Sequence, residues 1–176
     1  MTDEKHPTWI LPLADHEAKL VLTPCPGTKG VKLDASLGQL KDQHGVKAVV
    51  SSTTTAEMEK LGVSGMKDEC EKHGLVWLHC PINDDGAPKE DFAAAWPSAS
   101  QQVHQIIKDG GNVALHCKGG NGRTGLLASH ILLEMGVPVT TVEKSIKALR
   151  PGALTNPEHR AYVSGIASGL NLGTLA

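Results

Sequence analysis

Residues 114–125, with the sequence ALHCKGGNGRTG, combine a potential nucleophile with a basic and glycine-rich segment. Glycine stands at positions 119, 120, 122 and 125, although glycine adds no side-chain packing and loses the most conformational freedom on folding. An apolar strand is expected to end at Cys117 and an apolar helix to begin at Thr124, which leaves residues 117–123 as the connecting loop. Such a loop can direct successive backbone N–H groups to one point, at the positive end of the helix dipole. The spacing therefore predicts an anion-binding loop that begins with a cysteine.

Arg123 and Cys117 would make this anion site a reactive one. The planar guanidinium of Arg123 can bind two phosphate oxygens at once. The same positive surroundings favour the thiolate form of Cys117, and the thiolate is the nucleophile. The other phosphate contacts are expected from the loop at Lys118, Gly119, Gly120, Asn121 and Gly122. The alternative interpretation is a glycine-rich turn beside a buried cysteine.

The composition is that of a globular protein and excludes some partners. The chain has 176 residues and a formal net charge of -2, which disfavours nucleic-acid binding through a broad positive field. We expect one domain over residues 1–176, with short tails near residues 1–8 and 170–176. No secretory signal or membrane-spanning run is evident, and the four cysteines lack a dense disulfide spacing. A cytoplasmic protein with reduced thiols and no stable membrane insertion is therefore expected.

Apolar periodicity and turn signals predict strands that alternate with helices. Strands are expected at Trp9–Leu13, Lys19–Thr23, Val46–Ser51, Leu75–Cys80 and Asn112–His116. Helices are expected from Leu33 to a cap at Gly45, from a Thr54/Glu57 capping box to Gly62, at 64–73, along the apolar face Phe92, Trp96, Ala99, Val103 and Ile106, at Thr124–Met135, from a Thr140/Glu143 cap, and from Asn156-Pro157. Pro97 is expected to kink or restart the helix that contains it.

This alternation implies a single α/β domain, with a mostly parallel sheet of about five strands and helices on both faces. The helix that begins at Thr124 is almost wholly apolar and should therefore be the central one. Ligands of such folds bind at the carboxyl ends of the strands. The loop at residues 117–123 follows one of those ends.

The motif His-Cys-x5-Arg-Thr-Gly at residues 116–125 resembles the signature of the cysteine-dependent protein phosphatases, both tyrosine-specific and dual-specificity. The resemblance implies the protein tyrosine phosphatase fold and hydrolysis of phosphate monoesters through a cysteinyl-phosphate, without a metal or cofactor. It also implies that the Thr124 hydroxyl hydrogen-bonds the departing thiolate. His116 is expected to orient the loop from behind through backbone contacts.

The resemblance includes a second loop that carries an acid. Residues 84–88, Asp-Asp-Gly-Ala-Pro, resemble the family's Asp-x-Gly-x-Pro, although Ile82-Asn83 replaces the Trp-Pro of the tyrosine phosphatases. This departure is seen more in the dual-specificity branch. A carboxylic acid here can protonate the leaving oxygen, so Asp84 is the expected acid and Asp85 the fallback. The alternative is that both are solvated loop carboxylates.

Most of residues 20–165 resemble the kinase-associated phosphatase subgroup. The segments that carry the likeness are LTPCPGTKG, LGQLKDQHGVKAVVS and HGLVWLHCPINDDGAP. No residue indicates that subgroup's eukaryotic kinase partner. A later segment, RPGA at residues 150–153, is similar to a family segment with a downstream glutamine that can position hydrolytic water. His159 stands in place of that glutamine, either near the site or simply in the first turn of a helix.

A phosphorylated protein is the first expected substrate, with phosphotyrosine accepted and phosphoserine or phosphothreonine also considered. Lys118 adds positive charge, but Asn121 stands where phosphoinositide phosphatases often have a second basic residue. An inositol lipid or other small phosphoester therefore comes second, and an RNA 5′-phosphate third. Two other classes are a thiol-dependent arsenate reductase, which would need Cys80 as its second cysteine, and a non-catalytic phosphopeptide-binding module.

Cys80 raises two further alternatives. It could form a reversible disulfide with Cys117, although a plain buried cysteine is the simpler interpretation. The pairs His79-Cys80 and His116-Cys117 could also be read as a zinc site, but adjacent residues in a strand point to opposite faces. The sequence does not define an oligomeric state.

Overall fold

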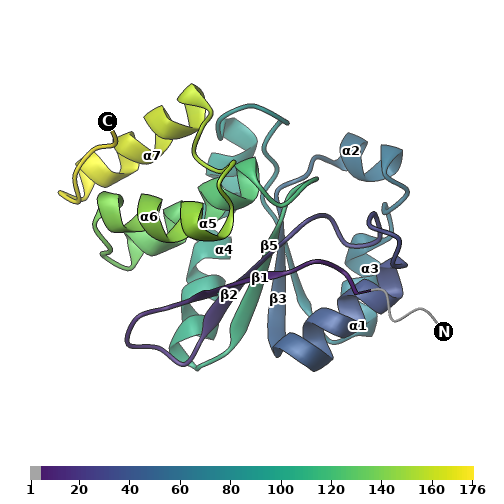
Figure 1. Ribbon diagram of the computed structural model, residues 1–176. Helices are drawn as coiled ribbons and strands as arrows, with labels where there is room; N and C mark the ends of the chain where they lie inside the picture. Colours follow the sequence, from purple (N-terminus) through teal and green to yellow (C-terminus); the bar gives the residue numbers. More distant parts are fainter. Residues whose placement is uncertain (1–4) are drawn as a thin grey trace.

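The computed structural model describes residues 5–176, and Figure 1 shows a layer of strands with helices on both sides. The strands are β1 (Trp9–Pro12), β2 (Lys19–Thr23), β3 (Val46–Ser51), β4 (Val76–His79) and β5 (Asn112–His116). They form a sheet in the order β1-β2-β5-β3-β4. Only β1 runs antiparallel to its neighbour among these strands. The predicted α/β class with a mostly parallel sheet is confirmed.

Helices cover the two faces of the sheet and enclose a hydrophobic core on each. They are α1 (Leu33–His44), α2 (Thr55–Lys60), α3 (Met66–Lys72), α4 (Glu90–Lys108), α5 (Gly122–Glu134), α6 (Val139–Leu149) and α7 (Pro157–Gly169). In Figure 1, α1 and α3 lie on one side of the sheet, and α4 to α7 on the other. Strand β5 contributes Val113 and Leu115 to the core under α4–α7 and Ala114 to the core under α1–α3. Successive side chains of a strand point to opposite faces, so β5 holds the two halves together.

Helix α5 is the buried helix that the apolar run predicts. Every residue from Arg123 to Leu133 is buried, including the fully buried Leu126, Leu127 and Ile131. The helix begins at Gly122, two residues before the expected start at Thr124. Arg123 therefore lies in the first helical turn, and a packed helix fixes its position.

Three local signals in the sequence act as expected. Gly45 ends α1 in the left-handed conformation, with φ of 61°, which glycine adopts without strain. Thr54 and Glu57 form both hydrogen bonds of a capping box at the start of α2. Asn156 caps α7 by accepting a hydrogen bond from the Glu158 N–H, with Pro157 as the first helical residue.

Other local predictions are only partly met or are wrong. The capping box expected from Thr140 and Glu143 is absent: α6 begins at Val139 after Pro138, without a side-chain cap. The Glu143 carboxylate instead accepts a hydrogen bond from Arg160 at 2.5 Å. In α4, Ile107 is buried, and the predicted Ile106 is partly buried and packs against the same core. Helix α4 continues through Pro97 as one element, so of the two outcomes expected at Pro97 the restart is wrong.

Parts of both predicted tails contact the rest of the structure. Of the N-terminal one, residues 1–4 lie outside the described residues, whereas His6 is buried and its Nε2 lies 3.0 Å from the Pro24 carbonyl oxygen. After α7, the Leu172 carbonyl accepts a hydrogen bond from the Val139 N–H. Within residues 5–176, no helix combines the length and the apolar character needed to cross a membrane.

Gly120 is a position where only glycine fits, and Gly119 beside it is a matched control. Gly120 has φ of 77°, and a Cβ there would lie 2.7 Å from the Pro24 nitrogen; a Cβ at Gly119 would meet nothing within 4 Å. Because left-handed strain and overpacking add, Gly120→Ala should lower the free energy of unfolding by about 2–4 kcal/mol. Gly119→Ala should change it far less. Thermal and urea unfolding measure both, and equal destabilisation would contradict the assignment.

Candidate active site

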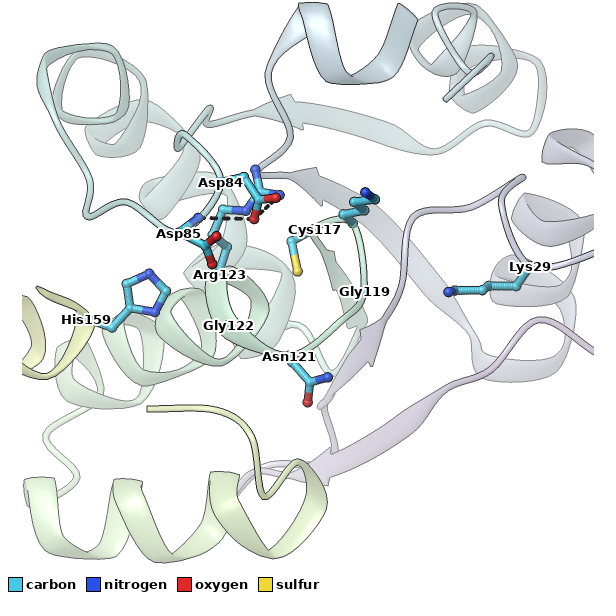
Figure 2. A pocket seen from close by; sticks show the side chains of 10 residues that line it. Lys29, Asp84, Asp85, Cys117, Gly119, Asn121, Gly122, Arg123 and His159 are labelled. Carbon is cyan, nitrogen blue, oxygen red and sulfur yellow. Dashed lines mark hydrogen bonds and ion pairs between the residues drawn. The ribbon is translucent and has the colours of Figure 1, made fainter. Parts of the chain in front are cut away.

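Cys117 follows the carboxyl end of β5 and opens the cysteine loop (residues 117–123). Its side chain is buried, and Figure 2 shows its sulfur directed into a pocket. The sulfur accepts a hydrogen bond from the Gly120 N–H at 3.2 Å and another from the Thr124 hydroxyl at 3.1 Å. Two donors directed at one sulfur stabilise a negative charge on it. The loop and the first turn of α5 thus surround Cys117 as an anionic nucleophile requires.

His116 lies behind the loop in a chain of buried hydrogen bonds. The Trp77 indole donates to the Ser51 hydroxyl at 2.8 Å, and Ser51 Oγ lies 2.6 Å from His116 Nε2. His116 Nδ1 lies 2.9 Å from the Cys117 carbonyl oxygen, which can only accept, so this nitrogen carries the proton. Burial lowers the pKa of His116 to about 4. A neutral imidazole that donates to the loop backbone is a support for the loop rather than a base.

Hydrogen bonds to its carbonyl oxygens also hold the cysteine loop in place. Arg150 donates from Nε to the Gly120 carbonyl at 3.0 Å and from a terminal nitrogen to the Gly119 carbonyl at 3.1 Å. The Cys25 N–H donates to the Lys118 carbonyl at 3.0 Å. Neither Arg150 nor Cys25 lines the pocket, so these carbonyls are bound away from it. Removing negative ends of the peptide dipoles from the pocket leaves a better environment for an anion.

Arg123 is buried and paired with Glu57. The side chain of Arg123 is 2% exposed, and its two terminal nitrogens donate to the two Glu57 carboxylate oxygens at 2.6 and 2.8 Å. Burial opposes ionisation of Glu57, but hydrogen bonds from Arg123 and Thr54 hold its pKa below the ordinary value. The bidentate pair fixes the plane of the guanidinium. The sequence indicated Glu57 only as a capping residue; its second partner lies 66 residues away.

The acid loop (residues 84–88) lies beside Arg123. One Asp84 oxygen is 3.3 Å from an Arg123 nitrogen and accepts a hydrogen bond from the Asp85 N–H at 3.1 Å. The Asp84 side chain is 57% exposed, so solvent reaches its carboxylate. Asp85 has a left-handed backbone, with φ of 59°. Figure 2 shows both carboxylates near the Arg123 guanidinium.

The pocket is lined by most of the residues that the sequence indicated; His116, Gly120 and Thr124 do not line it. It is a cavity of about 280 Å³. Its lining residues are Lys29, Asp84, Asp85, Cys117, Lys118, Gly119, Asn121, Gly122, Arg123 and His159. Sequence reasoning missed Lys29, which follows β2, and also missed Glu57 and Arg150. His159 is placed at the pocket: its Nδ1 is buried without a hydrogen-bond partner, and its Nε2 lies 2.8 Å from the Gly86 carbonyl oxygen.

The remaining cysteines are free and buried. Burial raises the pKa of both Cys25 and Cys80 to about 12, and the charge of Cys117 adds to the effect at Cys25 alone. Cys80 is thus the plain buried cysteine that the simpler interpretation predicts, whereas Cys25 contacts the cysteine loop through its N–H group. The alternative of a zinc site at His79-Cys80 and His116-Cys117 is not supported: both nitrogens of His116 are engaged, and among residues 5–176 the one group of potential ligands close enough to hold a metal ion is Asp34, Glu69 and His73.

A cysteine and an arginine at the two ends of a strand–loop–helix turn, facing a carboxylate loop, define a cysteine-dependent phosphatase of the tyrosine and dual-specificity class. The family model described as "Polymorphic toxin system, DSP-PTPase phosphatase" matches residues 29–137, and the chain belongs to this family. The phosphatase activity predicted from the sequence is thereby confirmed.

Curated relatives agree with this assignment. The chain is 28% identical over 155 residues to the cyclin-dependent kinase inhibitor 3 of Rattus norvegicus. This alignment covers 84% of this chain and 71% of the relative. It is 39% identical over 99 residues to the tyrosine-protein phosphatase CDC14 of Saccharomyces cerevisiae. That alignment covers 55% of this chain but 17% of the yeast protein.

Solved structures show the same fold. Kinase-associated phosphatase, with its catalytic cysteine substituted by serine, superposes with a TM-score of 0.84 at 22% identity, over 97% of this chain and 98% of that one. PTPMT1 in complex with PI(5)P gives a TM-score of 0.70 at 17% identity, over 86% and 92%. The resemblance to kinase-associated phosphatases that the sequence indicated is confirmed.

Replacing Glu57 by glutamine isolates the ion pair from the capping box. Glutamine can still accept from the Thr54 N–H, as capping boxes allow, but it no longer offers Arg123 a charged bidentate acceptor. Glu57→Gln should therefore lower kcat/KM about 10- to 100-fold, as loss of a supporting contact to a key side chain does. Glu59→Gln, at an exposed position of the same helix, is the control. Similar kinetics for the two variants would show that the pair is dispensable.

Proposed function

We propose that the substrate is a phosphorylated protein, with phosphotyrosine preferred and phosphoserine or phosphothreonine also hydrolysed. The observation that carries the proposal is the Cys117 sulfur, held by two hydrogen bonds in a pocket that Arg123 and Asp84 also line. The relatives named as tyrosine-protein phosphatases support a phosphoprotein substrate. Lys29 and Lys118 at the pocket supply positive charge next to the phosphate.

In the first step, the Cys117 thiolate attacks phosphorus in line with the leaving oxygen. The S–P bond forms as the P–O bond breaks, and protonated Asp84 gives its proton to the departing oxygen. The backbone N–H groups of residues 118–123 and the Arg123 guanidinium hold the other three phosphate oxygens. Because phosphoryl transfer depends on positioning and charge stabilisation, the fixed guanidinium and loop provide most of the acceleration.

In the second step, water attacks the cysteinyl-phosphate. Asp84, now ionised, takes a proton from the water, the S–P bond breaks, and inorganic phosphate leaves. The Thr124 hydroxyl, 3.1 Å from the sulfur, stabilises the returning thiolate. Asp84 is favoured over Asp85 as the acid because its carboxylate contacts the guanidinium that would bind the phosphate.

We also propose that the chain folds as a single phosphatase domain and works in a reducing compartment such as the cytoplasm. The two cores share β5, which supports a single folding unit. The four free thiols support reducing surroundings.

The nucleophile is tested with para-nitrophenyl phosphate in the presence of EDTA. Wild type should release para-nitrophenol and Cys117→Ser should release none, because the serine hydroxyl is a far weaker nucleophile than a thiolate. Comparison of phosphotyrosine, phosphoserine and phosphothreonine peptides with phosphoinositides then orders the substrates. A higher kcat/KM on the lipids would replace the phosphoprotein proposal. A folded wild type without turnover would point to a binding module, or to a thiol-dependent reductase if it reduced arsenate.

The acid is tested through the leaving group. Asp84→Asn should lower kcat/KM on alkyl phosphates by about 10²- to 10³-fold, because an alkoxide leaves poorly without a proton. It should lower kcat/KM far less on para-nitrophenyl phosphate, whose leaving group is already stable. Asp85→Asn is the matched variant at the neighbouring position. Equal losses for Asp84→Asn on both substrates, or the selective loss in Asp85→Asn instead, would refute the choice of Asp84.

A further inference from the structure

The first turn of α7 is attached to the acid loop at two consecutive carbonyl groups. Asn156 donates from Nδ2 to the Asp85 carbonyl at 2.9 Å. His159 Nε2 lies 2.8 Å from the Gly86 carbonyl oxygen. These residues lie more than 70 positions apart in the chain, so the contacts are purely tertiary. They leave the Asp84 carboxylate free to face the pocket.

The contact of His159 with the Gly86 carbonyl shows which ring nitrogen donates a hydrogen bond. A carbonyl oxygen only accepts hydrogen bonds, so His159 Nε2 must carry a proton. In the neutral ring Nδ1 is then an acceptor, and this atom is buried without a partner. The ring is 2% exposed, and a Cβ on Gly122 would lie 3.3 Å from its Cε1. His159 therefore bridges the acid loop and the start of α5 as a packed, oriented group.

The other contacts of this segment come from the pocket side. Arg123 donates to the Ile82 carbonyl at 2.8 Å and pairs with Asp84. The next residue, Asp85, adopts φ of 59°, a backbone conformation that is uncommon outside glycine although aspartate takes it more often than most residues. The Asn156 bond to the carbonyl of this same residue holds it in that conformation. The orientation of Asp84 is thus defined from two sides, by Arg123 and by α7.

We propose that Asn156 and His159 are positioning residues that hold the proton donor Asp84 in place at the pocket that Cys117 also lines. The proposal rests on the proposed function, because it assigns a role within the same reaction. A displacement of a catalytic group by about 1 Å can cost up to about 100-fold in rate. Loss of either contact should therefore impair proton donation while leaving the nucleophile and the phosphate contacts intact.

The test uses aryl phosphates whose leaving groups become progressively more basic, from para-nitrophenyl to phenyl, and an alkyl phosphate. His159→Leu keeps an apolar side chain of similar bulk but removes the donor. It should lose roughly 10- to 100-fold in kcat/KM on the alkyl phosphate and less than about threefold on para-nitrophenyl phosphate. His159→Gln restores an N–H donor and should recover most of the loss. A uniform loss along the series would overturn the proposal, since a merely structural role predicts that result.

A double-mutant cycle with Asp84→Asn provides the second readout. If His159 acts through Asp84, His159→Leu should cause little additional loss in the Asp84→Asn background. Multiplicative losses would overturn the proposal. A wild type that hydrolysed none of the esters would instead refute the proposed function.

Asn156→Ser keeps the proposal testable if His159→Leu folds poorly. Serine still caps α7 but cannot reach the Asp85 carbonyl, so the cap and the acid-loop contact are separated. This variant should retain its melting temperature and show the same steeper dependence on the leaving group. An unchanged dependence would remove Asn156 from the proposal.

Discussion

The buried ion pair between Arg123 and Glu57 is the constraint on which the site depends. A buried guanidinium is costly unless its charge is compensated, and Glu57 compensates it through two short hydrogen bonds. The same carboxylate also completes the cap of α2. One side chain thus couples the start of a helix on one face of the sheet to the first turn of the buried helix on the other. A phosphate would meet a guanidinium already locked in position.

The parallel sheet explains why these groups meet. Strands β3, β4 and β5 end at the same edge, and Ser51, His116 and Cys117 all lie there. The indole of Trp77, the hydroxyl of Ser51 and the imidazole of His116 form one hydrogen-bonded chain to the loop backbone. Arg150 holds the opposite side of the loop. The loop is rigid because its surroundings bind it, while its glycines allow the required backbone path.

Sequence reasoning succeeded where the signal is local. The spacing of Cys117 and Arg123 lies within one loop and helix turn, and Gly45, Asn156 and the Thr54/Glu57 box act over five residues or fewer. It failed where a side chain binds a partner that is distant in the chain. Glu143 pairs with Arg160 instead of capping α6, and nothing near Glu57 or Arg150 in the chain shows that each holds part of the site. Tertiary packing brings these partners together, so only the structure could show them.

The tryptophans give the site an optical signal of its own. The chain has three, and two contact groups that support the cysteine loop: the Arg150 guanidinium lies 3.6 Å above the Trp9 ring, and the Trp77 indole donates to Ser51. Indole emission responds to a nearby cation and to the hydrogen bond of its N–H group. Any movement of the loop that shifts Arg150 or the Ser51–His116 pair will change the intrinsic fluorescence. Binding of a ligand that displaces either group can thus be followed in the unlabelled protein, without turnover and without a chromogenic ester.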